Sequence, residues 1–206
     1  MKVLLINGSP HEKGCTYTAL SLIAGELKAQ GIETEILHVG GQPVGGCIGC
    51  GGCRSGNGCV FGGVVNEAIE KAKTADAFVF GSPVHYASAA GNMASFMDRL
   101  AYAGGKYLAY KPAAVCCSAR RAGTTSTLDQ LVKYPQFFHM PLVNGSYWAM
   151  VHGSNPEQVL QDAEGCAVMQ ELGRNMAWLL RCIAAGTAAG VPAPRQEPMA
   201  RTNFIR

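Results

Sequence analysis

The chain has 206 residues, of which 48% are apolar and 15% are charged, and its formal net charge is +3. A chain of this length can bury a core without disulfides, and this composition excludes a largely disordered protein. The small positive charge is not gathered into a basic block, which argues against nucleic-acid binding.

The sequence also lacks the pattern of an exported or membrane protein. The apolar run at residues 1–7 reaches Gly8 and Pro10 after too few apolar residues for a signal peptide. No stretch approaches the roughly 20 apolar residues of a membrane span. We therefore expect a cytoplasmic protein. In a reducing compartment, its nine cysteines favour metal binding or redox chemistry over structural disulfides.

The first part of the chain is typical of a strand, a helix and a second strand. Residues 3–7 form a short apolar run before a glycine turn, which predicts a buried parallel strand. Apolar residues at helical spacing predict a helix over 16–30, and alternation predicts a strand over 32–39. A long glycine-rich loop with four cysteines follows.

The alternation of helices and strands continues to the end of the compact part of the chain. It predicts a helix at 64–74, a strand at 77–80, a helix at 92–102, a strand at 113–117, a helix at 125–133, a strand approached or formed by 141–145, and a long helix from Asn155 to about Ala185 with Pro156 in its first turn.

Alternating strands and helices predict an α/β fold with a parallel sheet covered on both faces. Five strands suit the flavodoxin-like doubly wound order 2-1-3-4-5, in which ligands bind outside the carboxyl ends of the strands. We expect a single domain over residues 1–189 with a cysteine-rich insertion at 45–62. The proline-rich stretch after it predicts a C-terminal arm, residues 190–206, that packs on a neighbouring subunit.

Three loops follow strands at this carboxyl edge. Residues 8–20 carry glycines and hydroxyl groups before a helix, which is typical of a phosphate cradle, although a plain helix cap would look alike. Residues 81–100 would offer a flat ring an apolar wall, or would form an ordinary surface loop. Residues 117–128 combine close-approach residues with two arginines suited to an anion, or form a solvated basic turn.

Together the stretches GSP, GSPVHY with FMDR, and SARRAGTT resemble the NADPH-dependent FMN reductase family of flavodoxin-like proteins. The added cysteine run resembles that of the iron–sulfur flavoproteins within it. The resemblance covers residues 1–150 and implies an oxidoreductase with bound FMN that takes electrons from NAD(P)H. It also implies a homodimer or homotetramer.

Carried over by position, the resemblance implies three groups of FMN-binding residues. The phosphate would be surrounded by Ser9, His11, Cys15, Thr16 and Thr18, the isoalloxazine ring by Pro83, Val84, His85, Tyr86 and Ala87, and its pyrimidine edge by the segment from Ser118 to Gly123, with Arg120 and Arg121. The family often has Arg in place of His11, and Asn or Ser in place of Cys15. Phosphate binding here would therefore lean on backbone amides.

Catalytic groups are less sharply indicated. Arg120 would stabilise charge that develops at the flavin, and His85, Tyr86 and His152 are candidate proton donors that are also consistent with packing roles. Trp148 would cover the flavin or pack in the core. Asp98 and Arg99 suggest an ion pair within or between subunits.

Cys47, Cys50, Cys53 and Cys59 have the spacing that can wrap a [4Fe–4S] cluster, since each iron needs one thiolate and short glycine turns curl around it. Zinc sites usually separate their cysteine pairs by a longer span, and a reversible disulfide or free thiols remain alternatives. The other cysteines of strands and the last helix, Cys116, Cys117, Cys166 and Cys182, suit buried apolar positions.

Three functions fit these features. The first is an FMN-dependent NAD(P)H oxidoreductase acting on a quinone, a flavin, an azo or nitro compound, or a metal ion. The second is an iron–sulfur flavoprotein that exchanges electrons with a ferredoxin-like partner. The third is a metal- or thiol-based sensor without catalysis.

Overall fold

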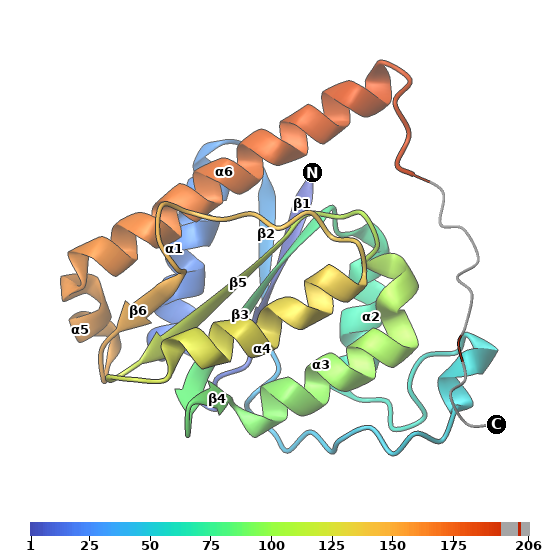
Figure 1. Cartoon of the computed structure of the whole chain (residues 1–206), viewed down its shortest axis with the longest axis horizontal. Coiled ribbons are helices and arrows are strands. Elements are labelled where there is room, and N and C mark those ends of the chain that lie inside the picture. The colour runs from blue at the N-terminus through green and yellow to red at the C-terminus, as the bar shows by residue number, and fades with distance from the viewer. Residues whose placement is uncertain (195–201, 203–206) are drawn as a thin grey trace.

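A parallel sheet runs through the centre of the molecule with helices on both sides (Figure 1). The computed structural model describes residues 1–194 and 202. Its strands are β1 (Lys2–Asn7), β2 (Glu33–His38), β3 (Ala77–His85), β4 (Ser88–Ala89), β5 (Ala113–Ala119) and β6 (Met150–His152). Its α-helices are α1 (Cys15–Ala29), α2 (Val64–Thr74), α3 (Gly91–Gly104), α4 (Thr124–Phe137), α5 (Pro156–Gln161) and α6 (Ala163–Ala188), and its 3₁₀ turns are η1 (Gly52–Ser55) and η2 (Gly105–Tyr107).

The order of the sheet confirms the predicted fold class. The strands lie in the order β2-β1-β3-β5-β6 and all of these pairs are parallel. Counted without the short β4, which pairs antiparallel with β3, this is the order 2-1-3-4-5. All five parallel strands therefore direct their carboxyl ends to one edge.

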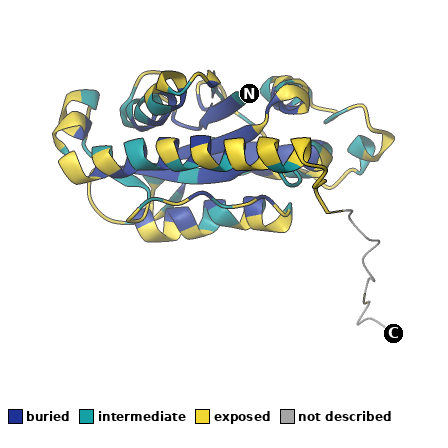
Figure 2. Cartoon of the chain, turned by 90° about the horizontal axis from the view of Figure 1, so that it is seen from above, coloured by how far each residue is buried: buried dark blue, intermediate teal, exposed yellow. Residues whose placement is uncertain are grey.

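The core lies in two layers, one on each face of the sheet. Because side chains alternate along a strand, Val3 and Leu5 of β1 face a cluster built with α1, α5 and α6. Leu4 and Ile6 face the other way, into a cluster built with α2, α3 and α4. Figure 2 shows the buried strands enclosed between helices whose outer faces are exposed.

Residues 141–145 lead to the fifth parallel strand and do not form it, so the first of the two predicted arrangements is correct. Residues 141–145 contain no strand, and only Leu142 forms an isolated bridge, with Ala113. The chain then leaves the edge of β5 and rejoins it where the Cys117 N–H donates to the Ala149 carbonyl at 3.0 Å. Consequently Trp148 precedes β6 and His152 ends it, whereas the sequence placed both after the strand.

The long last helix is in fact two helices that meet at Asp162. As predicted, Asn155 caps the first one, with Pro156 at its start. The Asp162 carboxylate accepts hydrogen bonds from the backbone N–H of Gly165 at 2.9 Å and of His152 at 2.7 Å. Capping a new helix and tying it to β6 offsets the loss of one helical turn.

Four of the five cysteines outside the insertion were predicted to be buried. Cys116 and Cys117 are buried in β5 as predicted, and burial raises the pKa of the Cys117 thiol to about 12. The prediction was wrong for Cys166, which is half-buried, and for Cys182, which is exposed. Residues 181–190, which end α6, are almost all exposed, so an apolar cysteine there is not covered.

Most of the predicted arm at 190–206 lies outside the described residues, and its separation from a domain at 1–189 stays a prediction. Within residues 1–194 and 202, none of the helices has both the length and the apolar character that crossing a bilayer requires.

Candidate functional site

The loop after β1 is held in shape by the buried side chain of Asn7. Its amide nitrogen donates to the Glu12 carbonyl at 2.9 Å, and its amide oxygen accepts from the Ser9 N–H at 3.1 Å. Asn7 is fully buried. The loop is therefore shaped by the protein itself before any ligand binds.

Ser9 takes part in the same internal bracing. Its hydroxyl oxygen accepts from the His11 N–H at 3.1 Å, and a ring nitrogen of His38, at the end of β2, lies 2.7 Å from the Ser9 carbonyl oxygen. The side chain of Ser9 is buried, whereas that of His11 is exposed. The structure thus gives Ser9 a role in loop geometry and leaves His11 facing solvent.

The beginning of α1 exposes backbone donors. The N-cap, Gly14, has no side-chain cap. Among the described residues, no protein acceptor is found for the backbone N–H groups of Glu12, Lys13, Cys15, Thr16 or Tyr17. Unsatisfied amides at a helix start, together with the helix dipole, favour an anion there. The start of α1 therefore offers donors that suit an anion.

Two hydroxyl groups connect this loop to the end of β5. Thr16 Oγ1 and Ser118 Oγ lie 2.8 Å apart, and both residues are buried. Thr18 donates its hydroxyl back to the Gly14 carbonyl at 3.2 Å. Cys15 donates to the Gly153 carbonyl at 3.5 Å, and burial raises the pKa of its thiol, which keeps it neutral. The first and third predicted loops are therefore in direct contact.

The second predicted loop is a β-hairpin. β3 continues through Pro83 and Val84 to His85, which pairs with Ser88 of β4. The connecting residues are Tyr86, with φ 50°, and Ala87, with φ 58°. Positive φ at both positions is the geometry of a type I′ turn, which usually requires glycine or asparagine. Such strain in non-glycine residues is common at functional sites.

The hairpin is fastened to the start of α4. The Gln130 side-chain oxygen accepts from the Ser88 hydroxyl at 2.7 Å and from the Ala89 N–H at 2.8 Å. The Ser126 hydroxyl donates to the Ala87 carbonyl at 2.7 Å. A Cβ added to Gly123, whose φ is 95°, would lie 2.8 Å from the Ala87 Cα. The second and third loops are thus packed together without room to spare.

The remaining candidates lie around this edge. Arg120 and Arg121 are exposed, and neither forms an ion pair with any described residue. His85 and Tyr86 are exposed at the hairpin tip. His152 Nδ1 lies 3.6 Å from an Asp162 carboxylate oxygen, so this ring already has a partner within the protein. The two guanidinium groups, which have no ion-pair partner among the described residues, are therefore available to a bound anion at this edge.

The four cysteines of the insertion line one cavity of about 300 Å³, next to α3. All four are free thiols, with Cys47 and Cys50 exposed and Cys53 and Cys59 half-buried. Across residues 1–194 and 202, no three Cys, His, Asp or Glu side chains stand close enough together to hold a metal ion. The four thiols thus line the same cavity but are too far apart to coordinate one metal ion in this conformation.

Asp98 and Arg99 do not pair within the chain, contrary to one of the two arrangements that the sequence suggests. An Asp98 carboxylate oxygen accepts from the Tyr134 hydroxyl at 2.6 Å. Arg99 turns into the cysteine insertion. Adjacent residues on a helix point in different directions, so each finds a separate partner.

Several residues that brace the site were not selected from the sequence. Asn7 and His38 brace the first loop, and Ser126 and Gln130 fasten the hairpin. A polar residue that ends an apolar strand, as Asn7 and His38 do, is the one signal that points to such a role. The helix residues Ser126 and Gln130 look like ordinary surface positions in sequence.

The model of the NADPH-dependent FMN reductase family matches residues 1–155 of this chain. The chain belongs to that family. Membership of a family of FMN reductases supports a flavin-dependent oxidoreductase. The loops described above lie at the edge of the sheet where this fold binds ligands. An iron–sulfur flavoprotein of Methanocaldococcus jannaschii is 28% identical over 191 residues, which cover 89% of this chain and 99% of the relative.

Solved structures agree with the fold. A structure of RosB with a bound intermediate, 8-demethyl-8-formylriboflavin-5′-phosphate, superposes with a TM-score of 0.70 at 15% identity, covering 100% of this chain and 92% of RosB. A flavodoxin from the domain Archaea superposes with a TM-score of 0.60 at 14% identity, covering 88% of this chain and 99% of the flavodoxin. At such identities the likeness supports the flavodoxin-like fold of this family member.

Proposed function

We propose that this family member is an NAD(P)H-dependent oxidoreductase that passes electrons through bound FMN to a small acceptor. The acceptor classes are a quinone, a free flavin, an azo or nitro compound, or a metal ion. One observation carries the proposal. The three loops predicted to surround the flavin touch one another at a single edge of the sheet, through the Thr16–Ser118 and Ser126–Ala87 hydrogen bonds.

The residues present suit FMN because the phosphate and the ring would each find a matching surface. The uncapped start of α1 offers backbone N–H groups to the phosphate, as the helix dipole favours. The strained hairpin turn at Tyr86 and Ala87 offers a wall to the ring. The loop from Ser118 to Gly123 offers donors to the pyrimidine edge. Bound FMN would supply the hydride and electron chemistry.

In this proposal the protein's own groups position the flavin and stabilise the charge that develops on its ring. Asn7 and His38 keep the phosphate loop in shape, so little order has to be gained on binding. Arg120 and Arg121 place positive charge where negative charge would develop on the ring. His85 and Tyr86, exposed at the hairpin tip, are the candidate proton donors that face solvent.

The sharpest test compares FMN with riboflavin, which has the same ring but no phosphate. Metal-free protein is titrated with each flavin, and binding is followed by quenching of flavin fluorescence. The amide cradle predicts that riboflavin binds at least about tenfold more weakly, since charge-assisted hydrogen bonds contribute about 1.5–3 kcal/mol each. Absence of FMN binding would remove the proposal. Equal binding of both flavins would show that the start of α1 does not bind the phosphate.

Turnover then identifies the donor and the acceptor class. Protein loaded with FMN is assayed with NADH and with NADPH against a quinone, a nitro compound and ferric citrate. Oxidation of neither nicotinamide with any acceptor would exclude this activity while leaving FMN binding intact. Light scattering on the same sample tests the expected homodimer or homotetramer.

A second candidate function is an iron–sulfur flavoprotein that exchanges single electrons with a ferredoxin-like protein. It is favoured by the four thiols that line one cavity and by the name of the Methanocaldococcus relative. Cys47, Cys50, Cys53 and Cys59 would hold a [4Fe–4S] cluster, which requires the insertion to close further around it. Zinc and a reversible disulfide compete for the same thiols.

Anaerobic purification decides between these occupants. Iron and acid-labile sulfide in equal amounts support the cluster, and their absence after reconstitution excludes it. Zinc would appear in the same metal analysis, and a disulfide in a thiol count before and after reduction. If a cluster forms, Cys50→Ser should abolish electron transfer from reduced ferredoxin, and unchanged transfer would exclude the module.

A further inference from the structure

Arg99 is the charged residue that stands out among the buried positions of the described chain, with 6% of its surface exposed. A buried guanidinium normally requires a carboxylate partner or several hydrogen bonds. Within residues 1–194 and 202 it has no carboxylate partner. All its polar contacts within this part of the chain go instead to two backbone carbonyls and one cysteine sulfur of the insertion.

These contacts reach both ends and one thiol of the insertion. Nη1 donates to the carbonyl of Gly45, its first residue, at 3.4 Å, and Nη2 donates to the carbonyl of Gly62, its last residue, at 3.0 Å. Nε donates to Cys59 Sγ at 3.2 Å. The guanidinium also lies 5.4 Å from the centre of the Phe61 ring. One side chain thus closes the whole segment.

The helix that carries Arg99 is a rigid base for this contact. At its start, the Asn92 amide nitrogen donates to the carbonyls of Gly40 and Gln42, and its oxygen accepts from the Val44 N–H. The segment therefore runs along α3 from Asn92 to Arg99, and Figure 1 shows it beside that helix. Asn92 thus holds the residues just before the insertion, and Arg99 holds the insertion itself.

Cys59 is held more firmly than the other three cysteines. Besides the Arg99 contact, its N–H donates to the Asn66 side-chain oxygen at 2.8 Å, and its carbonyl accepts from the Asn66 nitrogen at 3.0 Å. Cys47 and Cys50 are exposed. Among the described residues, no hydrogen bond is found for the thiols of Cys47, Cys50 or Cys53.

We propose that Arg99 is the positioning residue of the cysteine segment. It fixes Cys59 and both ends of the insertion, so that a metal centre forms when Cys47, Cys50 and Cys53 close onto a thiol already in place. The metal part of this inference rests on the second proposed function. The ordering of the segment by Arg99 does not, because the contacts exist in the metal-free chain.

The chemistry of the Nε–H···S contact gives Arg99 a second effect. A hydrogen bond to a ligand sulfur stabilises negative charge on it, and such bonds raise the reduction potential of an iron–sulfur cluster. The guanidinium adds its own positive charge. Losing both should shift the potential of a bound cluster to more negative values.

The first test uses metal-free protein and three variants. Arg99→Gln removes both the positive charge and the planar guanidinium with its several donors. Arg99→Lys keeps the charge but lacks the guanidinium. Arg54→Gln is the matched control. Arg54 lines the same cavity, and its side chain forms no hydrogen bond or ion pair with the described residues. Hydrogen exchange of the backbone amides at 45–62 is measured by mass spectrometry.

Both Arg99 variants should exchange these amides at least about tenfold faster, since losing charge-assisted hydrogen bonds lowers the free energy of local opening. Arg54→Gln should match the wild type. Wild-type exchange in Arg99→Gln would overturn the proposal. Wild-type exchange in Arg99→Lys would overturn the role of the three-point contact. If Arg99→Gln does not fold, Arg99→Lys carries the comparison.

The second test loads the same proteins with iron and sulfide under anaerobic conditions. A chelator should remove iron from Arg99→Gln about 10–100-fold more readily than from the wild type, and the potential should be more negative. Unchanged retention and potential would overturn the effect on the metal. If the wild type takes up no iron, the cluster hypothesis fails, and the exchange experiment still decides the role of Arg99.

Discussion

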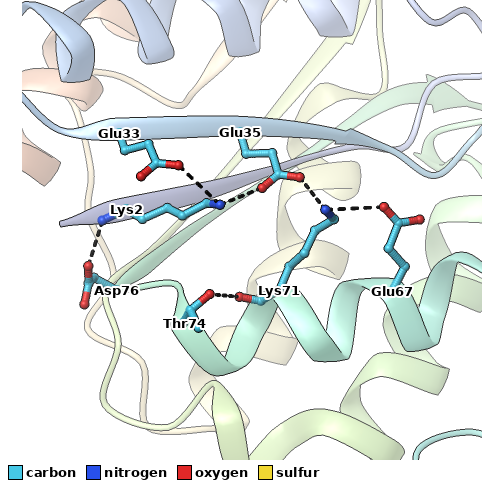
Figure 3. Close-up of polar contacts among 7 residues, drawn as sticks. All are labelled: Lys2, Glu33, Glu35, Glu67, Lys71, Thr74 and Asp76. Atoms are coloured by element: carbon cyan, nitrogen blue, oxygen red, sulfur yellow. Dashed lines mark hydrogen bonds and ion pairs between the residues drawn. The ribbon is translucent and has the colours of Figure 1, made fainter.

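The two ends of the sheet satisfy their polar groups in opposite ways. At the amino end, charged side chains pair with one another, as Figure 3 shows. Lys2 Nζ lies 2.8 Å from a Glu35 carboxylate oxygen, and Lys71 Nζ lies 2.6 Å from the other. The Lys2 N–H donates to Asp76 at 2.7 Å. The charged groups at this end are therefore paired with one another within the protein.

At the carboxyl end the corresponding groups are left open. The amides at the start of α1 have no protein acceptor among the described residues, and Arg120 and Arg121 have no carboxylate partner there. Two non-glycine residues of the hairpin have positive φ. Donors without acceptors and retained strain are costs that a bound ligand can offset. The comparison therefore supports the proposal that ligands bind at the carboxyl end, while the amino end contributes stability.

The largest effect should come from filling the space between the second and third loops. Gly123→Ala places a Cβ 2.8 Å from the Ala87 Cα and from Val84, at a φ of 95° that alanine rarely adopts. We expect FMN affinity to fall at least about tenfold and stability to fall by about 1–3 kcal/mol. Flavin titration and urea unfolding measure the two effects.

Gly25→Ala is the control for that substitution, because Gly25 is exposed within α1 and nothing lies within 4 Å of an added Cβ. It should leave FMN binding unchanged and raise stability slightly. Wild-type FMN affinity in Gly123→Ala would mean that the packing of these two loops does not shape the flavin site.

The buried hydroxyl pair gives an intermediate effect and separates structure from binding. Thr16→Val leaves the Ser118 hydroxyl buried without a partner, which should cost about 1–3 kcal/mol. In the double variant Thr16→Val/Ser118→Ala both polar groups are gone, so stability should largely return. Urea unfolding without FMN measures this.

The FMN affinity of the same double variant then shows whether Thr16 contacts the phosphate. Because its hydroxyl faces Ser118, we expect the double variant to bind FMN within about threefold of the wild type, a difference of about 0.7 kcal/mol. A stable double variant that binds FMN at least tenfold more weakly would show instead that Thr16 contacts the phosphate directly.

The sequence predicted the fold because each of its signals is local. Apolar runs such as Leu4 to Ile6 before a glycine turn, and helical spacing over α1, do not depend on distant residues. The meeting of the three loops follows from parallel strands alone, since these strands share one carboxyl edge. Thr16 and Ser118 were selected in this way, and the structure brings them together.

What the sequence could not predict depends on contacts between distant residues. The break before α6 arises because Asp162 binds His152 of β6, and the true position of β6 depends on where the chain rejoins Cys117. Arg99 looks like the partner of its neighbour Asp98 until the insertion folds back over α3. Each of these is decided by tertiary contact and not by local pattern.

The smallest effect tests the amino end. Hydrogen bonds and charge from Lys2, and then from Lys71, hold the pKa of Glu35 below its usual range. A carboxyl whose folded-state pKa is lowered stabilises the protein while it is ionised, and this contribution is lost as the pH falls through that pKa. Glu35→Gln should therefore lower stability at neutral pH by up to about 1 kcal/mol, because the pair is partly exposed and screened.

The difference between wild type and Glu35→Gln should shrink to nothing in the acid range below the usual pKa of a glutamate. Unfolding curves across pH measure it, with Glu70→Gln as the control, since Glu70 pairs only with the exposed Lys73 among the described residues. FMN affinity should not change, because no residue of this network belongs to the three loops. Weaker FMN binding in Glu35→Gln would show that the two ends of the sheet are coupled, and the division between a stabilising end and a binding end would be wrong.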